Sequence, residues 1–153
     1  MKKKTATNTV IINRRARFDY ELGETISAGI ILSGPEVRGA RMGHVRLTGS
    51  YANIKSGELW LTNMSISIPK TAQAQVQEKE LTTARKLLVT KKELLQIEEA
   101  KKQGMTIVPT RLFTNGRFIK IELTIARGKK SYDKRETIKR RQQDREAKRE
   151  LKR

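Results

Sequence analysis

Two stretches of the chain alternate apolar with polar residues on either side of a turn signal, the pattern of a β-hairpin. In residues 50–63 (SYANIKSGELWLTN) the turn falls at Ser56-Gly57, so we expect Lys55 to face Glu58 across the strands. Alternation places one set of apolar side chains on a common, buried face: Ala52, Ile54, Leu59 and Leu61. The opposite face carries Tyr51, Asn53 and Trp60, whose aromatic pair either stacks on bases or packs beneath a loop or helix.

The second hairpin covers residues 106–128 and turns at Asn115-Gly116, two residues that tolerate positive φ. This register makes Phe113 and Phe118 cross-strand neighbours, either as a stacking surface or as a satellite packing cluster. Arg111, Lys120 and Glu122 share their face. The other face is expected to hold most of the apolar residues: Val108, Leu112, Ile119, Ile121, Leu123 and Ile125.

Helical periodicity is clearest in residues 90–104 (TKKELLQIEEAKKQG). Thr90 and Glu93 have the spacing of a capping box, and Gly104 is a stop signal. The apolar stripe consists of Leu94, Leu95, Ile97 and Ala100, while Lys101 and Lys102 occupy the last turn, where the helix dipole favours cations. A marginal helix is also expected over residues 72–81, inside a polar connection.

The remaining segments predict shorter elements. Residues 18–32 mix aromatic, β-branched and glycine residues, as a long bent strand would. Ser33 is expected to cap a short helix with Pro35 and Glu36 in its first turn, its length limited by Gly39 and Gly43. Residues 85–90 (RKLLVT) predict a short strand.

Strands separated by turns, with one helix before the last hairpin, predict a mainly β fold: a small oligonucleotide-binding-type β-barrel with a few helices. We divide the chain into a flexible N-terminus (1–9), the barrel (10–127) and a basic C-terminal tail (128–153). Residues 127–153 hold thirteen Lys and Arg against five Asp and Glu, a net charge of +8. Their few apolar residues form no stripe that could hold a helix on the barrel, so we expect a tail that is disordered when free and helical when bound. The alternative is a solvated tail that only adds non-specific affinity.

The charge of the whole chain points to an anionic partner. The formal net charge is +18 and the pI is near 10.6, which favours nucleic acid first and an anionic membrane second. The chain has no cysteine and one histidine, His44, which excludes disulfides, thiolate sites and multi-histidine metal sites. We therefore expect no metal, no cofactor and no catalysis. The apolar runs are too short for a signal peptide or a membrane span, so we expect a cytoplasmic protein.

Five segments together resemble one protein family, the SsrA-binding proteins, also called small protein B, of bacterial trans-translation. They are AGIILSGPEVRGAR (28–41), SYANIKSGELWL (50–61), ARKLLVTKKEL (84–94), MTIVPTRLFTNGRFIKIEL (105–123) and ARGKKSYDKRETIKRR (126–141). The segments follow the family's order and cover most of the chain. The resemblance implies an RNA-binding adaptor that binds the tRNA-like domain of transfer-messenger RNA (tmRNA) and helps deliver it to the A site of stalled ribosomes.

The resemblance also implies partners and site residues. The partners are tmRNA, small-subunit ribosomal RNA at the decoding centre and, through the RNA, elongation factor Tu; the protein acts as a monomer away from membranes. Residues implied in tmRNA binding are Asn13, Arg14, Arg15, Glu36, Arg38, Leu87 and Leu88. Residues implied at the empty decoding centre and message channel are Gly128, Lys129, Lys130, Tyr132, Asp133, Lys134 and Arg135.

Two alternatives stay open. Glu36 either accepts hydrogen bonds from RNA or is a helix N-terminal carboxylate satisfied by backbone amides. The whole protein could also be a ribosomal protein or a general single-strand RNA-binding protein on a similar barrel.

Overall fold

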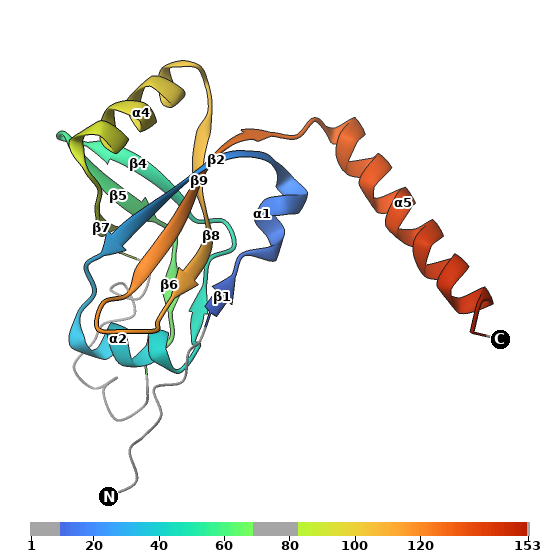
Figure 1. Cartoon of the computed structure of the whole chain (residues 1–153), viewed down its shortest axis with the longest axis horizontal. Coiled ribbons are helices and arrows are strands. Elements are labelled where there is room, and N and C mark those ends of the chain that lie inside the picture. Colours follow the sequence, from blue (N-terminus) through green and yellow to red (C-terminus); the bar gives the residue numbers. More distant parts are fainter. Residues whose placement is uncertain (1–9, 69–82, 153) are drawn as a thin grey trace, which may run out of the picture.

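A computed structural model describes residues 10–68 and 83–152 and shows a β-barrel body from which a long helix projects (Figure 1). The predictions for residues 1–9 and for a helix over 72–81 lie outside the described residues. The strands are β1 (Val10–Ile12), β2 (Tyr20–Ile30), β3 (Val45–Arg46), β4 (Tyr51–Lys55), β5 (Glu58–Thr62), β6 (Ser65–Ile66), β7 (Arg85–Leu88), β8 (Thr106–Phe113) and β9 (Lys120–Gly128). The helices are α1 (Arg14–Asp19), α2 (Gly34–Arg41), α4 (Lys91–Lys102) and α5 (Ser131–Glu150).

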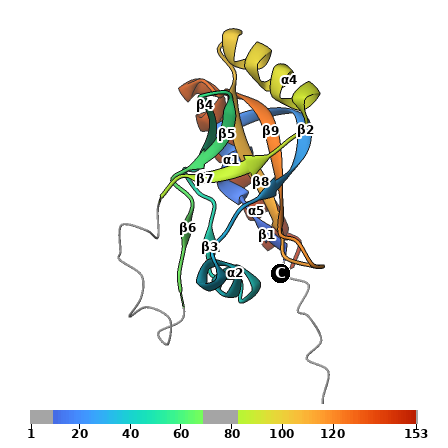
Figure 2. The ribbon, with the colours of Figure 1, turned by 90° about the vertical axis from the view of Figure 1, so that its left-hand side faces the viewer.

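Six antiparallel strands close into the predicted barrel, in the order β8-β4-β5-β7-β2-β9 and back to β8. The short β1 pairs with the end of β8, along the same edge on which β4 pairs with the start of β8. Strands β3 and β6 form a separate two-stranded sheet next to α2. Helix α4 lies at the opposite end of the barrel from α2 (Figure 2). The barrel is filled by aliphatic side chains, of which the most deeply buried include Leu59, Leu61, Met64, Ile66, Ile97, Ile107, Leu112, Ile121 and Leu123.

The hairpin formed by β4 and β5 confirms its sequence prediction. Ser56 and Gly57 both take positive φ, and Lys55 pairs with Glu58. Ala52, Leu59 and Leu61 are buried, with Ile54 partly buried against them. The turn residues and the alternation of apolar and polar residues were sufficient to predict this hairpin, because both strands and the turn lie within fourteen residues.

Helix α4 also begins and ends as predicted. Thr90 and Glu93 form a reciprocal capping box, and Gly104 follows the helix with a φ of +80°. Ile97 and Ala100 are buried, but Leu95 is 64% exposed, so its place in the apolar stripe was wrong. The contact between α4 and the barrel is narrow, so it buries only some of the apolar residues that we assigned to one face of the helix.

The segment 18–32 confirms the long bent strand that its composition predicts, except at its first two residues. Its first two residues end α1, and β2 begins only at Tyr20 and contains an irregularity between Leu22 and Thr25.

Helix α2 does start after Ser33, but Gly39 lies within it. A Cβ at Gly39 would come within 2.6 Å of the Ser67 carbonyl oxygen, so glycine there permits close packing against the chain after β6.

The register of the last hairpin corrects the sequence prediction. Phe113 pairs with Lys120, so Phe113 and Phe118 are not cross-strand neighbours. The connection is longer than two residues because Arg41 of α2 donates hydrogen bonds to the carbonyl oxygens of Thr114, Gly116 and Arg117. This contact stabilises a wider loop, on which Phe118 is 70% exposed.

A second register shift, between Pro109 and Arg111, moves Val108 off the expected core face. Val108 instead packs with Ala16 and Ala126 on the outer side of the barrel, beneath α1. Proline lacks the amide hydrogen that a regular ladder needs, which makes this position suited to an irregularity. The same shift gives α1 an apolar surface on which to rest.

Candidate functional site

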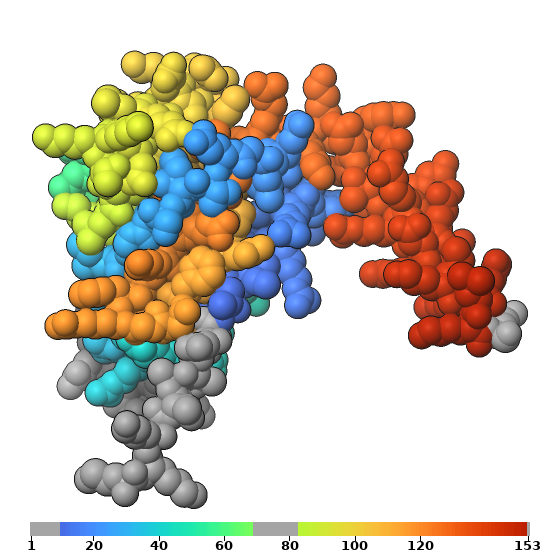
Figure 3. All heavy atoms as spheres, viewed as in Figure 1, coloured from blue at the N-terminus to red at the C-terminus, as the bar shows by residue number. Residues whose placement is uncertain are grey.

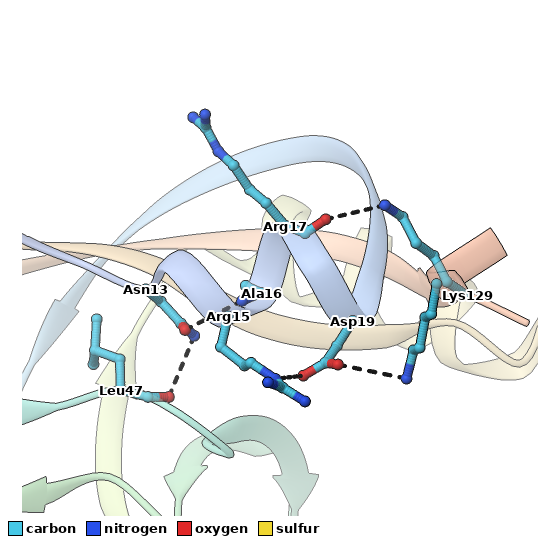
Figure 4. A network of polar contacts seen from close by, with 8 residues as sticks. Asn13, Arg15, Ala16, Arg17, Asp19, Leu47 and Lys129 are labelled. Carbon is cyan, nitrogen blue, oxygen red and sulfur yellow. Dashed lines mark hydrogen bonds and ion pairs between the residues drawn. The ribbon is translucent and has the colours of Figure 1, made fainter. Parts of the chain in front are cut away.

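Asn13 connects α1 to the barrel and is 6% exposed. Its Oδ1 accepts from the Ala16 amide at 3.3 Å, which makes it the N-cap of α1. Its Nδ2 donates to the carbonyl oxygen of Pro109 at 2.8 Å. The same Nδ2 donates to the carbonyl oxygen of Leu47 at 3.3 Å (Figure 4). Both amide donors are thus used inside the protein, so Asn13 fixes the position of α1 rather than presenting a free group to solvent.

Arg14 and Arg15 follow this cap and are exposed on α1. Arg15 Nε lies 3.0 Å from Asp19 Oδ2, and its guanidinium lies over the ring of Phe18 at 5.0 Å. With its side chain 59% exposed, Arg15 keeps most of its surface available to an anion. Helix α1 therefore presents cations outward while its N-cap is locked inward.

Glu36 lies in the first turn of α2 and has two partners. Its Oε2 accepts from the Ser33 amide at 2.9 Å, and its Oε1 accepts from Arg85 Nε and Nη2 at 3.0 and 2.7 Å. The Arg85 side chain is only 3% exposed and also donates to the Met64 carbonyl oxygen at 2.6 Å. Of the two interpretations of Glu36, the structure shows the intramolecular one, extended by a buried ion pair.

Arg85 was not singled out from the sequence, although it begins the strand RKLL. An arginine at the start of a predicted strand gives no local sign of burial, because its partner Glu36 is 49 residues away. The pair connects α2 to β7. It therefore fixes the position of α2 relative to β7, the two elements that carry Arg38 and Leu88.

The other implied residues of these segments divide by exposure. Arg38 is exposed on α2. Leu88 is 53% exposed at the end of β7, whereas Leu87 is 2% exposed and part of the core. Of the two leucines, Leu88 is the one that an RNA could touch.

The tail begins where β9 ends and is attached to α1 by main-chain and side-chain contacts. The Lys129 amide donates to the Asp19 carbonyl oxygen at 3.0 Å, and Lys129 Nζ donates to the Arg17 carbonyl oxygen at 3.1 Å (Figure 4). Lys134 Nζ lies 3.4 Å from Asp19 Oδ1. Farther along α5, Arg141 lies over Phe18 at 5.8 Å. Asp19 therefore binds one cation of α1 and one of the tail, and no sequence motif pointed to it.

Beyond this attachment α5 is exposed along its length. None of its twenty residues is buried, and the space-filling view shows it extending away from the body (Figure 3). Tyr132 is 73% exposed, and Gly128, Lys130, Asp133 and Arg135 are exposed around it. Residues 131–150, which we expected to be helical when bound, thus form a helix in the structure. The disorder of the tail in the free protein stays a prediction.

Two other classes of site find no support in the part of the chain described. Among residues 10–68 and 83–152, no three His, Asp or Glu side chains come together as a metal site would require. Within the same ranges, no helix combines the length and apolar character needed to cross a bilayer. What these residues do provide is a body with exposed cations on α1 and α2 and an exposed basic helix.

Comparison with known proteins gives consistent matches. The family model described as SmpB protein matches residues 10–153. An SsrA-binding protein of Streptococcus mutans is 41% identical over 150 residues, covering 97% of this chain and 96% of its own. The SsrA-binding protein of Chelativorans sp. is 46% identical over 154 residues, and that of Parabacteroides distasonis is 45% identical over 155 residues; coverage of each chain is 98% or more.

Among solved structures, the chain is similar to one from a work named "tmRNA-SmpB: a journey to the center of the bacterial ribosome". The TM-score is 0.65 and the identity 41%. The match covers 80% of this chain and 85% of the other.

Proposed function

Because this chain belongs to the SmpB family of SsrA-binding proteins, we propose that it is an RNA-binding adaptor of trans-translation. It binds the tRNA-like domain of tmRNA and helps deliver that RNA to the A site of stalled ribosomes in the cytoplasm. It acts as a monomer without catalysis, and it meets elongation factor Tu through the RNA. The names of the relatives support binding to SsrA RNA, and the name of the solved structure joins SmpB with tmRNA and the ribosome.

The body is the part proposed to bind tmRNA. Arg14, Arg15, Arg38 and Leu88 are exposed and form the contacts. Asn13 and Glu36 act as positioning residues, because their polar atoms are already bonded to the Pro109 carbonyl and to Arg85. Leu87 supports the same strand from the core side. RNA recognition of this kind depends on shape and on phosphate contacts more than on a duplex groove.

The tail is the part proposed to reach the ribosome. Lys129, Lys130, Lys134 and Arg135 neutralise phosphates, and Tyr132 stacks on an exposed base at the empty decoding centre, worth about 1–3 kcal/mol. Gly128 is the last residue of β9, just before the tail leaves the barrel, and Asp133 lies in the first turn of α5, where a carboxylate is favourable. The rest of the helix enters the vacant message channel.

The observation that supports this division most strongly is the contrast in burial between body and tail. None of the twenty residues of α5 is buried, and eight of them are Lys or Arg against five Asp or Glu, although the helix is anchored near its start to α1. A helix built only to stabilise the barrel would bury an apolar stripe. An exposed cationic helix on a fixed base is suited to an anionic partner outside the protein.

Truncation tests the proposal. Ending the chain after Lys130 keeps β9 and the Lys129 contacts with α1, so the barrel remains intact. We expect this variant to bind tmRNA nearly as well as the full chain and to lose tagging of stalled peptides in a reconstituted translation system. Equal loss of both activities would contradict the division between body and tail.

A point substitution tests the tail residue by itself. Tyr132→Ala should reduce tagging more than tmRNA affinity, whereas Tyr132→Phe, which keeps the flat ring, should retain most tagging. Unchanged tagging by Tyr132→Ala would make Tyr132 a spacer. Stable binding to vacant small subunits without tmRNA would instead favour the ribosomal-protein alternative.

A further inference from the structure

The outer face of the β4–β5 hairpin carries an aromatic and cationic patch that the proposed function leaves unused. Strand pairing places Asn53, Trp60 and Lys86 side by side across β4, β5 and β7. The next row holds Lys55 and Glu58, and Tyr51 lies on the same face at the other end of β4. These six residues are called the outer hairpin patch below.

Trp60 lines an open hollow on this patch. The hollow has a volume of about 410 Å³ and is lined by Asn53, Lys55, Ser56, Glu58, Trp60, Thr62 and Ala84. No residue of a described helix belongs to this lining. Tyr51 is 38% exposed, and Trp60 is half-buried, unlike the core residues Leu59 and Leu61 on either side of it. Trp60 therefore faces an open hollow, and Tyr51 lies outside its lining on the same face of β4.

The charge of the patch favours an anion. Its one carboxylate, Glu58, is paired with Lys86 Nζ at 2.7 Å. Lys101 of α4 reaches the patch and donates to Asn53 Oδ1. Lys55 is exposed and has no ion pair or hydrogen bond to another described side chain. The Lys86–Glu58 pair carries no net charge, so Lys55 and Lys101 give the patch its positive charge.

We propose that the outer hairpin patch binds single-stranded RNA, with an unpaired base stacked on Trp60 and the adjacent phosphates near Lys55 and Lys101. Every base offers a π-face to an aromatic ring, and a cationic groove follows the phosphates, so such a site needs no sequence preference. On β7 the patch adjoins Leu88, which comes two residues after Lys86 and therefore lies on the same face of the strand. The site extends the RNA-contacting surface of the proposed function and rests on it.

Trp60 is the single tryptophan of the chain, so intrinsic fluorescence reports directly on the patch. The full-length protein is titrated with oligouridylate of about twelve nucleotides, within the usual range of single-strand site sizes. We expect saturable quenching of Trp60. In a separate anisotropy assay with labelled oligonucleotide, Trp60→Leu should weaken binding by roughly 5- to 150-fold, and Trp60→Phe should weaken it much less.

A charge variant keeps the test independent of any folding defect at Trp60. Lys55→Gln leaves the indole in place and should lower the salt dependence of quenching by about 0.7 in log–log slope, the value for one phosphate contact on a single strand. Arg46→Gln removes the same charge from β3, outside the hairpin, and should leave the midpoint of quenching unchanged. Thermal unfolding measured by circular dichroism verifies that each variant is folded.

The outcomes separate this site from the rest of the molecule. Oligonucleotide binding without quenching, or equal affinity of Trp60→Leu and the parent, would assign binding to the tail and overturn the proposal. Quenching by an oligoglutamate peptide but not by RNA would make the patch a protein-binding surface and would overturn it as well. Parallel filter binding with the tRNA-like domain tests the proposed function. If the protein does not bind the tRNA-like domain but oligouridylate still quenches Trp60, tmRNA recognition is refuted. The single-strand site at Trp60 is then still supported.

Discussion

The barrel and the tail helix are both regular and continuous, yet they differ in what stabilises them. The barrel closes around aliphatic side chains such as Leu61 and Ile121, which have no exposed surface. Helix α5 buries none of its residues and contacts the body mainly through α1. Burial of apolar surface contributes about 25 cal/mol per Å², so the barrel has a large stabilising term that the tail lacks.

This contrast shows which part of the molecule can change shape in response to a partner. A helix without tertiary burial depends on local hydrogen bonds and lacks the packing that supplies most of the stability of helices in proteins. Its ion pair with Asp19, formed by Lys134, lies near the protein surface and is worth about 0–1 kcal/mol. The barrel can thus serve as a rigid platform while the tail adjusts. The predictions below compare substitutions in the two regions.

The largest effect on stability is expected at the buried ion pair. Arg85→Met leaves the Glu36 carboxylate, whose side chain is 12% exposed, without its main partner. Breaking such a pair from one side should lower the free energy of unfolding by about 3–5 kcal/mol. Urea denaturation measures this loss. Adding Glu36→Leu to Arg85→Met should recover part of it, and a double variant no more stable than the single one would contradict the explanation.

Two matched substitutions, each of which shortens an aliphatic side chain to alanine, compare the barrel with the tail helix directly. Leu61→Ala in the barrel should lower the free energy of unfolding by about 2–5 kcal/mol through lost burial and a residual cavity. Ile138→Ala in α5 removes an aliphatic group from a residue that is 51% exposed and should change it by no more than about 0.5 kcal/mol. Thermal and urea unfolding measure both variants. Comparable losses would mean that the tail helix contributes to the core.

An intermediate effect is expected at the cap of α1. Asn13→Ala removes the N-cap and leaves the buried carbonyl oxygens of Pro109 and Leu47 without this donor. The expected loss of unfolding free energy is about 1–3 kcal/mol. If Asn13 acts by positioning α1, tmRNA affinity should fall together with protection of the α1 amides from hydrogen exchange. Loss of affinity with unchanged protection would instead indicate a direct RNA contact.

The smallest change in stability is expected at the tail attachment. Asp19→Ala should alter the free energy of unfolding by less than about 1 kcal/mol, because both of its ion pairs lie near the surface. It should nevertheless broaden the distance distribution between spin labels on cysteines that replace Lys92 and Gln142. Arg15→Ala keeps the contact of Asp19 with Lys134 and is the control. An unchanged distribution in Asp19→Ala would mean that the contacts of Lys129 and Arg141 with α1 set the direction of the tail.

Much of the fold followed from local pattern. The hairpin at Ser56-Gly57 and helix α4 with its Thr90 cap were predicted with their turns and ends. The register at Phe113 was not, because the loop is stabilised by Arg41, more than seventy residues away. The position of Val108 was missed for a related reason, since the irregularity after Pro109 becomes visible only when β8 meets β9.

By itself the sequence determined the barrel class, the capped helix α4, the excess of positive charge and a tail with too few apolar residues to join the core. These properties depend on composition and on neighbours a few residues apart. Only the tertiary structure decided that Asn13 faces inward and that Glu36 pairs with Arg85, through hydrogen bonds that span 96 and 49 residues. A polar side chain looks the same in the sequence whether it meets solvent, RNA or a buried partner, because that difference arises only when distant segments come together.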